Sequence, residues 1–364
     1  MSAHVVTKEQ IKHSLDTWYQ SMLKQDFIQS KSLKEEIDSQ ISAIEVNQHI
    51  LLHYSLMNFR YQVLTDSLSV TKESFDTIDS LYDSDDSVLT YYYHLFKAIH
   101  ETLVTNYKVA NEEFEKAKSL LEDISDPLEQ AEFYYRFGYF YYQVYEPMLG
   151  IDNVNKARTE FEKHNGYEVS VALCKNMYGL CCLDLKQFSL AEENFYAALD
   201  VFQKKGIERY ILMVKSNLGW LYGSQDLSEL SIRHIAEVVE KSPKHFKAVF
   251  TLAEENYKLG RTDLANEFID SGFQICNELK NKEFQYRFMI LKELNKKSDT
   301  ETLENVVLEG ISYFENECLW ECVKEYTEKL AIRFYEESND SKACKYFYMS
   351  NKASKKYLEK GALK

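Results

Sequence analysis

Turn-forming residues are scarce in this sequence, which contains only 11 glycines and 3 prolines among 364 residues. Together with 27 tyrosines and 21 phenylalanines, this scarcity excludes a disordered chain, a collagen-like chain and a turn-rich all-β fold. No stretch approaches the ~18 apolar residues of a membrane-spanning helix, and the first ten residues lack the apolar core of a signal peptide. We therefore expect a soluble helical protein of the cytoplasm that makes no use of a membrane.

Positive charge is also in short supply. The chain has 43 Lys and Arg against 58 Asp and Glu, which gives a net charge of −15. Because binding to phosphate backbones relies on clustered Lys and Arg, nucleic acid is not expected as a partner. The seven cysteines are odd in number, and two of them, Cys181 and Cys182, are adjacent. This usage predicts reduced thiols rather than a disulfide framework.

Common enzyme motifs are missing: the sequence contains no GxGxxG, GxxxxGK[ST], HExxH, GxSxG or CxxC. His49 and His53 have the i, i+4 spacing of metal ligands on a helix, but no third ligand accompanies them. We interpret both as surface histidines and predict no metal site.

A pattern of small and aromatic residues recurs at intervals of 34 to 41 residues. Its clearest copy has Gly179 followed by Ala191, Phe195 and Ala198, the arrangement of a tetratricopeptide repeat. The small residues let two antiparallel helices approach, and the aromatic ring fills the gap between neighbouring hairpins. Further copies start at Ala98, Gly138, Gly219, Ala253, Leu291 and Ala331. Seven copies in one phase predict an all-α fold containing a superhelical array of about seven tetratricopeptide-like helix hairpins.

The first seventy residues lie outside this phase. Thr7 can cap a helix with apolar residues at helical spacing, a second apolar set follows from Phe27, and a third, longer helix is predicted roughly over residues 45–67. We therefore expect a three-helix bundle over residues 1–70 and the repeat domain over residues 71–364. A joint is predicted over residues 69–74.

The concave side of such an array can bind a peptide, because amide side chains bind its backbone and apolar positions bury its side chains. Asp184 and Phe250 occupy positions of the first helix of a hairpin that face this groove, and Asn217 lies beside one. The alternative for a lone asparagine is a polar residue that merely faces solvent.

The segment NQHILLHYSLMNFR, residues 47–60, closely resembles the third N-terminal helix of the Rap proteins of Bacillus, which are response-regulator aspartyl-phosphate phosphatases. The resemblance continues in LDLKQF (183–188), KSNLGWLY (215–222), YKLGR (257–261) and FYEESNDSKACKYF (334–347). It covers nearly the whole chain, and both the bundle and the repeats agree with that architecture.

The resemblance implies that the bundle and the first repeats together bind a receiver domain. Gln48 matches the glutamine that enters the receiver's active site and orients a water for attack on the phosphoaspartate. An amide suits this task because it accepts from water and donates to a phosphoryl oxygen without adding negative charge. The receiver supplies Mg²⁺, so this chain needs no cofactor of its own. The same helix face carries the residues expected to contact the receiver: Leu52, Ser55, Leu56 and Phe59.

The resemblance also implies regulation by a small imported peptide that binds the groove, closes the array and displaces the bundle. The matching peptide-binding residues are Asp184, Asn217 and Phe250, with Asn217 holding the peptide backbone and Asp184 pairing with a basic group. The chain departs from the family at Arg287 and Met289, which stand where relatives carry acidic residues.

Three functions remain open at this point. The first is a phosphatase of a sporulation-relay receiver under peptide control. The alternative is non-catalytic sequestration of a response-regulator DNA-binding domain, also under peptide control, and a third is a general repeat scaffold for other proteins. A DNA-binding regulator is rejected, because the first seventy residues predict long helices without a short recognition helix.

Overall fold

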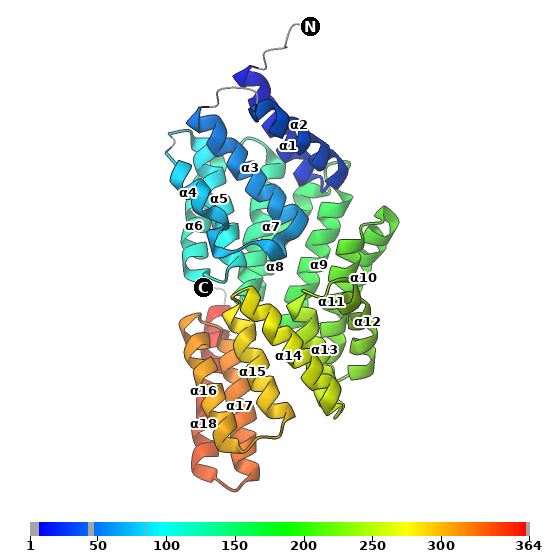
Figure 1. The fold of residues 1–364 in the computed structure, drawn as a ribbon, viewed down its shortest axis with the longest axis vertical. Helices are drawn as coiled ribbons and strands as arrows, with labels where there is room; N and C mark the ends of the chain where they lie inside the picture. The colour runs from blue at the N-terminus through cyan, green and yellow to red at the C-terminus, as the bar shows by residue number, and fades with distance from the viewer. Residues whose placement is uncertain (1–6, 43–46, 84, 362–364) are drawn as a thin grey trace. The chain divides into compact units, whose positions relative to one another are not determined.

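The computed structural model describes residues 7–42, 47–83 and 85–361. Within these ranges the regular structure consists of eighteen α-helices and three short 3-10 helices, without a strand. The predicted all-α class is confirmed, and Figure 1 shows the helices following one another as antiparallel pairs. In the same part of the chain, no helix is both long and apolar enough to span a membrane.

Three helices open the chain: α1 (Lys8–Leu23), α2 (Phe27–Ser42) and α3 (Gln48–Asp66). Helix α1 begins at a capping box, in which Thr7 Oγ1 accepts from Gln10 N and Thr7 N donates to Gln10 Oε1. Helix α1 packs against both α2 and α3. The predicted cap at Thr7 and the three helices are confirmed, although residues 45 and 46 of the predicted third helix lie outside the described residues.

Seven hairpins follow, and their bounds agree with the predicted repeats. They are α5 (Ser87–Leu103) with α6 (Tyr107–Ser119), α7 (Pro127–Gln143) with α8 (Pro147–Phe161), α9 (Glu168–Asp184) with α10 (Phe188–Lys205), α11 (Glu208–Gly223) with α12 (Ser228–Lys241), α13 (Phe246–Lys258) with α14 (Thr262–Glu278), α15 (Lys282–Asn295) with α16 (Thr300–Asn316), and α17 (Trp320–Glu336) with α18 (Asp340–Gly361). The first anchor of every copy lies on the first helix of a hairpin, and the remaining anchors lie on the second.

The close approach of paired helices explains the small anchors. A Cβ added at Gly179 would lie 2.7 Å from Cε1 of Phe195, so only glycine fits there. The last copy departs from the prediction, because its expected aromatic anchor Phe347 is 44% exposed. Tyr346 is the buried ring instead and stacks on Phe334 at 5.7 Å.

Each hairpin turns at a residue with positive φ in the left-handed region. These residues are Thr105, Tyr145, Lys186, Asp226, Gly260, Lys297 and Ser338. After each of them the next N–H donates to a carbonyl five residues earlier, as Gln187 N does to Cys182 O at 2.8 Å. This is the Schellman closure of a helix C-terminus, and it repeats with the period of the anchors.

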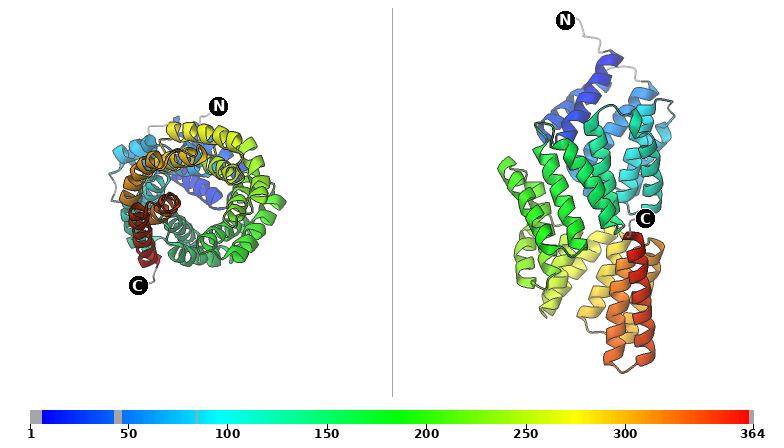
Figure 2. Two further views of the ribbon diagram at one scale, coloured as in Figure 1. Left: turned by 90° about the horizontal axis from the view of Figure 1, so that it is seen from below. Right: turned by 180° about the vertical axis from the view of Figure 1, so that it is seen from behind.

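A short connection joins the first three helices to the hairpins: η1 (Ser67–Ser69), η2 (Lys72–Phe75) and α4 (Asp76–Leu81). The packing divides the chain into two compact units. Unit 1 runs to Phe140 and includes Asp152–Cys174, and unit 2 comprises Tyr141–Ile151 and the chain from Lys175 onward. The division does not fall near residue 70, because α3 packs on α4 and α5. Figure 2 shows the later hairpins of unit 2 from two further directions.

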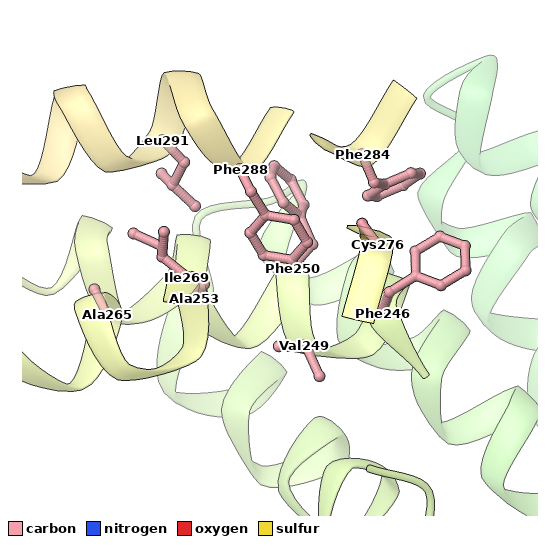
Figure 3. Packing of buried hydrophobic residues seen from close by; sticks show 10 residues of the cluster. All are labelled: Phe246, Val249, Phe250, Ala253, Ala265, Ile269, Cys276, Phe284, Phe288 and Leu291. Carbon is pink, nitrogen blue, oxygen red and sulfur yellow. The ribbon is translucent and has the colours of Figure 1, made fainter. Parts of the chain in front are cut away.

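The hairpins of unit 2 are held together by buried rings. Phe250 on α13 and Phe284 and Phe288 on α15 pack edge to face, with the centroids of Phe250 and Phe288 5.1 Å apart. Figure 3 shows these rings pointing toward one another from facing helices, with Ile269 of α14 beside them. Burial of such rings is the main source of stability in an array of this kind.

Gly272 on α14 is a sensitive point of this core. A Cβ there would lie 2.1 Å from Cζ of Phe288, whose ring is fully buried. We expect Gly272→Ala to lower the free energy of unfolding by about 1–3 kcal/mol through overpacking, despite its better helix propensity. Urea denaturation checks this. Gly310→Ala is the matched control, because its Cβ would meet side chains at 3.2 Å and 3.3 Å; equal losses for the two variants would contradict the overpacking argument.

Candidate functional site

Gln48 lies in the first turn of α3 with its side chain exposed. The turn is fixed by Asn47, whose Oδ1 accepts from Ile50 N at 3.0 Å. The Gln48 amide donates from Nε2 to the carbonyl of Leu81 at 3.3 Å, a long bond that links it to the end of α4. An amide at the positive end of a helix, held only by one weak bond, is available to a partner's phosphoryl group.

The segment beside Gln48 is held firmly to α5. Tyr82 stacks on Tyr93 with ring centroids 3.7 Å apart, and the Tyr93 hydroxyl donates to Asp79 at 2.7 Å. Asp86 caps α5 and lies 3.3 Å from Nε2 of His49. Burial would raise the pKa of Asp86, but hydrogen bonds from the backbone N–H of Leu89, from His49 and from the N–H of Val88 hold it below its ordinary value. The carboxylate next to Gln48 is therefore already engaged.

The predicted receiver-contact residues do not share one surface. Leu52, Leu56 and Phe59 are 1%, 0% and 3% exposed, whereas Ser55 is half-buried. Direct contact of the first three with a receiver is excluded in this structure, because α3 turns their face into unit 1. Phe59, for example, packs edge to face on Phe75 at 5.1 Å. The predicted contact role of these three residues is corrected to a core role.

The outer face of α3 starts from Gln48 and includes the predicted Ser55 together with Leu51 and Asn58, which the sequence did not single out. Leu51 is 36% exposed, and Ser55 and Asn58 are half-buried on the same side of the helix. Their spacing of three and four residues places them on one stripe with Gln48. The spacing of Leu51 and Asn58 from Gln48 was the signal available in the sequence. Periodicity could not show which face of α3 is buried, because this helix is apolar nearly all round.

The two histidines of α3 behave differently from each other. His49 is exposed as predicted, but His53 is 4% exposed and stacks on Tyr92 at 6.1 Å, so its predicted surface position is wrong. Burial lowers the pKa of His53 to about 4, which keeps the ring neutral. Within the described residues no group of three or more His, Cys, Asp or Glu side chains is arranged to hold a metal ion.

A buried charge network fixes α3 to its neighbours. Glu132 of α7 accepts from Arg60 Nε of α3 at 2.7 Å and from the Tyr19 hydroxyl of α1 at 2.9 Å. Arg136 adds a second guanidinium at 3.1 Å. Burial would raise the pKa of Glu132, but Arg60 and Arg136 hold it below its ordinary value. The helix that carries Gln48 is thus anchored by one carboxylate shared among three elements.

The predicted peptide-binding residues lie in unit 2. Asn217 of α11 donates from Nδ2 to Oδ1 of Asn176 on α9 at 2.7 Å, and Asn176 is 1% exposed. This bond fixes the Asn217 amide between successive first helices of hairpins. Within the described residues Asn217 Oδ1 accepts no hydrogen bond, so it can accept a peptide N–H.

Asp184 at the end of α9 has an unsatisfied oxygen. Its Oδ2 is buried and finds no hydrogen-bond partner within the described residues. Burial raises the pKa of Asp184 well above its ordinary range, Glu321 raises it further and Lys247 lowers it. A cation placed beside Asp184 would both satisfy this oxygen and stabilise its charged form.

Phe250 is 8% exposed and belongs to the aromatic core shown in Figure 3. The guanidinium of Arg287 lies over its ring at 5.3 Å from the centroid. The predicted direct contact of Phe250 with a peptide is therefore corrected, because the chain's own arginine covers the ring. The first helices of the last three hairpins lie close together near Phe250. Lys329 Nζ of α17 lies 3.8 Å from a carboxylate oxygen of Glu254 on α13, although α15 stands between these helices in the sequence.

The comparisons with known proteins agree with this architecture. A family profile described as "response regulator aspartate phosphatase H, N terminal" matches residues 5–66, which include Gln48. The chain is 26% identical to response regulator aspartate phosphatase I of Bacillus subtilis (strain 168), over 97% of this chain and 92% of that protein. It is 25% identical to the regulatory protein RapF of the same strain, over 94% of each.

Solved structures share the fold. A Rap protein complexed with Competence and Sporulation Factor matches with a TM-score of 0.83 at 22% identity, over 97% of this chain and 100% of that one. NprR in complex with its cognate peptide NprX matches with a TM-score of 0.72 at 16% identity, over 94% and 98% of the two chains. Both are helical-repeat proteins recorded with a bound peptide or factor.

Proposed function

The chain belongs to the Rap family, and from this premise we propose that it removes the phosphoryl group from the phosphoaspartate of a response-regulator receiver domain. The receiver is one of the sporulation phosphorelay, and the reaction takes place in the cytoplasm. The observation that carries the proposal is the position of Gln48, exposed in the first turn of α3 and inside the segment matched by the phosphatase profile.

The chemistry follows from the amide. Gln48 exchanges its weak bond to Leu81 for contacts in the receiver: its carbonyl oxygen accepts from a water and its N–H donates to a phosphoryl oxygen. The water attacks phosphorus, the bond from phosphorus to the aspartate oxygen breaks, and inorganic phosphate and the free carboxylate are released. A Mg²⁺ ion would be held by the receiver and not by this chain, and it would supply positive charge beside the phosphoryl oxygens. Leu51 and Ser55 extend the contact along the outer face of α3.

Regulation is proposed to come from an imported oligopeptide bound by unit 2. Asn217 accepts a hydrogen bond from a backbone N–H of the peptide, and Asp184 forms an ion pair with a basic group of the peptide. Peptide binding lowers affinity for the receiver, and linkage then requires that the receiver lower affinity for the peptide by the same factor. Two titrations of the chain separate phosphatase action from sequestration, one with a phosphorylated receiver domain and one with a response-regulator DNA-binding domain that lacks its receiver. A phosphatase releases phosphate from the phosphorylated receiver, whereas a sequestering protein binds the DNA-binding domain and releases none.

Asn217→Ala tests the peptide assignment. We expect the peptide concentration for half-inhibition to rise at least about tenfold, since a hydrogen bond to the peptide backbone is lost and Asn176 loses its partner. An inhibition titration measures this. Asn194→Ala is the control, because Asn194 is half-buried on α10, as Asn217 is on α11, and donates to Leu190 O of its own helix. Identical inhibition curves for wild type and Asn217→Ala would reject the assignment.

A further inference from the structure

Arg287 on α15 is enclosed by the groups that ordinarily recognise a guanidinium from a ligand. Its guanidinium lies over the rings of Phe250 and Phe284, at 5.3 Å and 5.1 Å from the centroids. Its Nη atoms lie 3.7 Å from Glu283 and 3.9 Å from Glu325. Two aromatic faces and two carboxylates form a cation subsite, and the chain itself fills it, although Arg287 Nε finds no hydrogen-bond partner within the described residues.

The remaining charges around this subsite are also paired. Lys329 lies 2.6 Å from Glu325 and 3.8 Å from Glu254, so both carboxylates already face a cation. Burial would raise the pKa of Glu325, but Lys329 and Arg287 hold it below its ordinary value. A basic side chain arriving from a ligand would meet two cations here and no free carboxylate.

Asp184 presents the opposite situation. Its Oδ2 is buried and unpartnered within the described residues, and no ion pair to it is formed there. Besides burial, which raises the pKa of Asp184 most, Glu321 raises it further and Lys247 lowers it. Lys247 donates to Gln143 Oε1 at 3.4 Å and lies over Phe284 rather than beside a carboxylate. The Asp184 carboxyl therefore has no cation paired with it, unlike the carboxylates around Arg287, and a cation supplied by a ligand would stabilise its charged form.

We propose that Arg287 determines peptide specificity by acting as a resident cation: it fills the subsite of Phe250, Phe284, Glu283 and Glu325 and so excludes a basic peptide side chain from it. The inference rests on the proposed binding of an oligopeptide by unit 2. The ligand of this chain is a peptide with one basic group, which pairs with Asp184, and with a neutral or acidic residue opposite Arg287.

Affinity selection from a defined peptide mixture tests this. The probe is a synthetic pentapeptide library with arginine or its neutral isostere citrulline at each position, bound to the full chain and read by mass spectrometry. We expect wild type to enrich peptides with a single arginine. Arg287→Gln, which empties the subsite, should enrich peptides with two arginines by at least about tenfold relative to wild type. Arg287→Lys, which keeps a cation there, should select as wild type does.

Two controls separate the possible failures. Asp184→Asn should lose the preference for a single arginine, and melting curves identify any variant that does not fold. If the folded Arg287→Gln variant selects the same peptides as wild type, or if wild type already accepts two arginines, the specificity role of Arg287 is wrong while peptide binding stands. If wild type enriches no peptide at all, the proposed peptide regulation fails, and this inference fails with it.

Discussion

Gln48→Ala should lower the rate of receiver dephosphorylation by at least about 100-fold, the loss typical of removing one group that positions or stabilises the reacting atoms. Affinity for the receiver should stay within about twofold, because truncating an exposed side chain outside a packed core costs little. Gln48 is exposed and bonded only to Leu81 O at 3.3 Å, so its removal leaves α3 in place. Single-turnover phosphate release and calorimetric binding measure the two quantities.

Gln62→Ala is the matched control, because Gln62 lies near the other end of the same helix and donates to Ser69 Oγ at a similar 3.3 Å. It should leave both the rate and the affinity unchanged. Gln48→Glu should be as inactive as Gln48→Ala, since a carboxylate repels the phosphoryl oxygens. Turnover retained in Gln48→Ala would remove the amide from the mechanism.

Glu132→Ala should destabilise unit 1 by about 3–5 kcal/mol, the cost of leaving a buried charge without its partner. Arg60 is 1% exposed, and Glu132 is the carboxylate that accepts from it. The Tyr19 hydroxyl loses its acceptor in the same step. Urea denaturation followed by the fluorescence of Trp18 reports on unit 1 when Trp220 and Trp320 are replaced by phenylalanine.

A surface ion pair provides the comparison. Asp152 and Lys156 form an ion pair at 2.7 Å, and both side chains are at least half exposed. Asp152→Asn should therefore lower the free energy of unfolding by less than about 1 kcal/mol. Replacing both partners of the buried pair, as in Arg60→Met with Glu132→Leu, should recover part of the loss because no charge is then stranded. A loss below about 1 kcal/mol for Glu132→Ala would contradict the anchoring role of the network.

Much of the fold could be predicted from the sequence, because small and aromatic anchors at fixed spacing are direct signs of paired helices. The hairpins from α5 to α18 and the cap at Thr7 follow from residue types alone. The turns could not be predicted in the same way. Six of the seven left-handed turn residues are not glycine, and a residue such as Lys186 gives no sign of positive φ.

The candidate site was only partly predictable, because the sequence does not say which residues its neighbours cover. Resemblance predicts roles for Gln48 and Asn217, and the exposed Gln48 and the half-buried Asn217 are both accessible enough for these roles. It also assigned contact roles to Leu56 and Phe250, which the structure buries. Periodicity cannot orient a helix such as α3 that is apolar on most faces, and nothing in the sequence says that Arg287 would cover Phe250. Such facts depend on which neighbours cover a residue.

The most direct test of the account is the loss of phosphate from a labelled sporulation-relay receiver, measured with the chain at a concentration well below that of the receiver. We predict that phosphate is released much faster than by the receiver alone and in amounts exceeding the chain present, since a catalyst turns over. Phosphate loss equal to that of the receiver alone, or limited to one equivalent of the chain, would contradict the proposed phosphatase activity and favour sequestration.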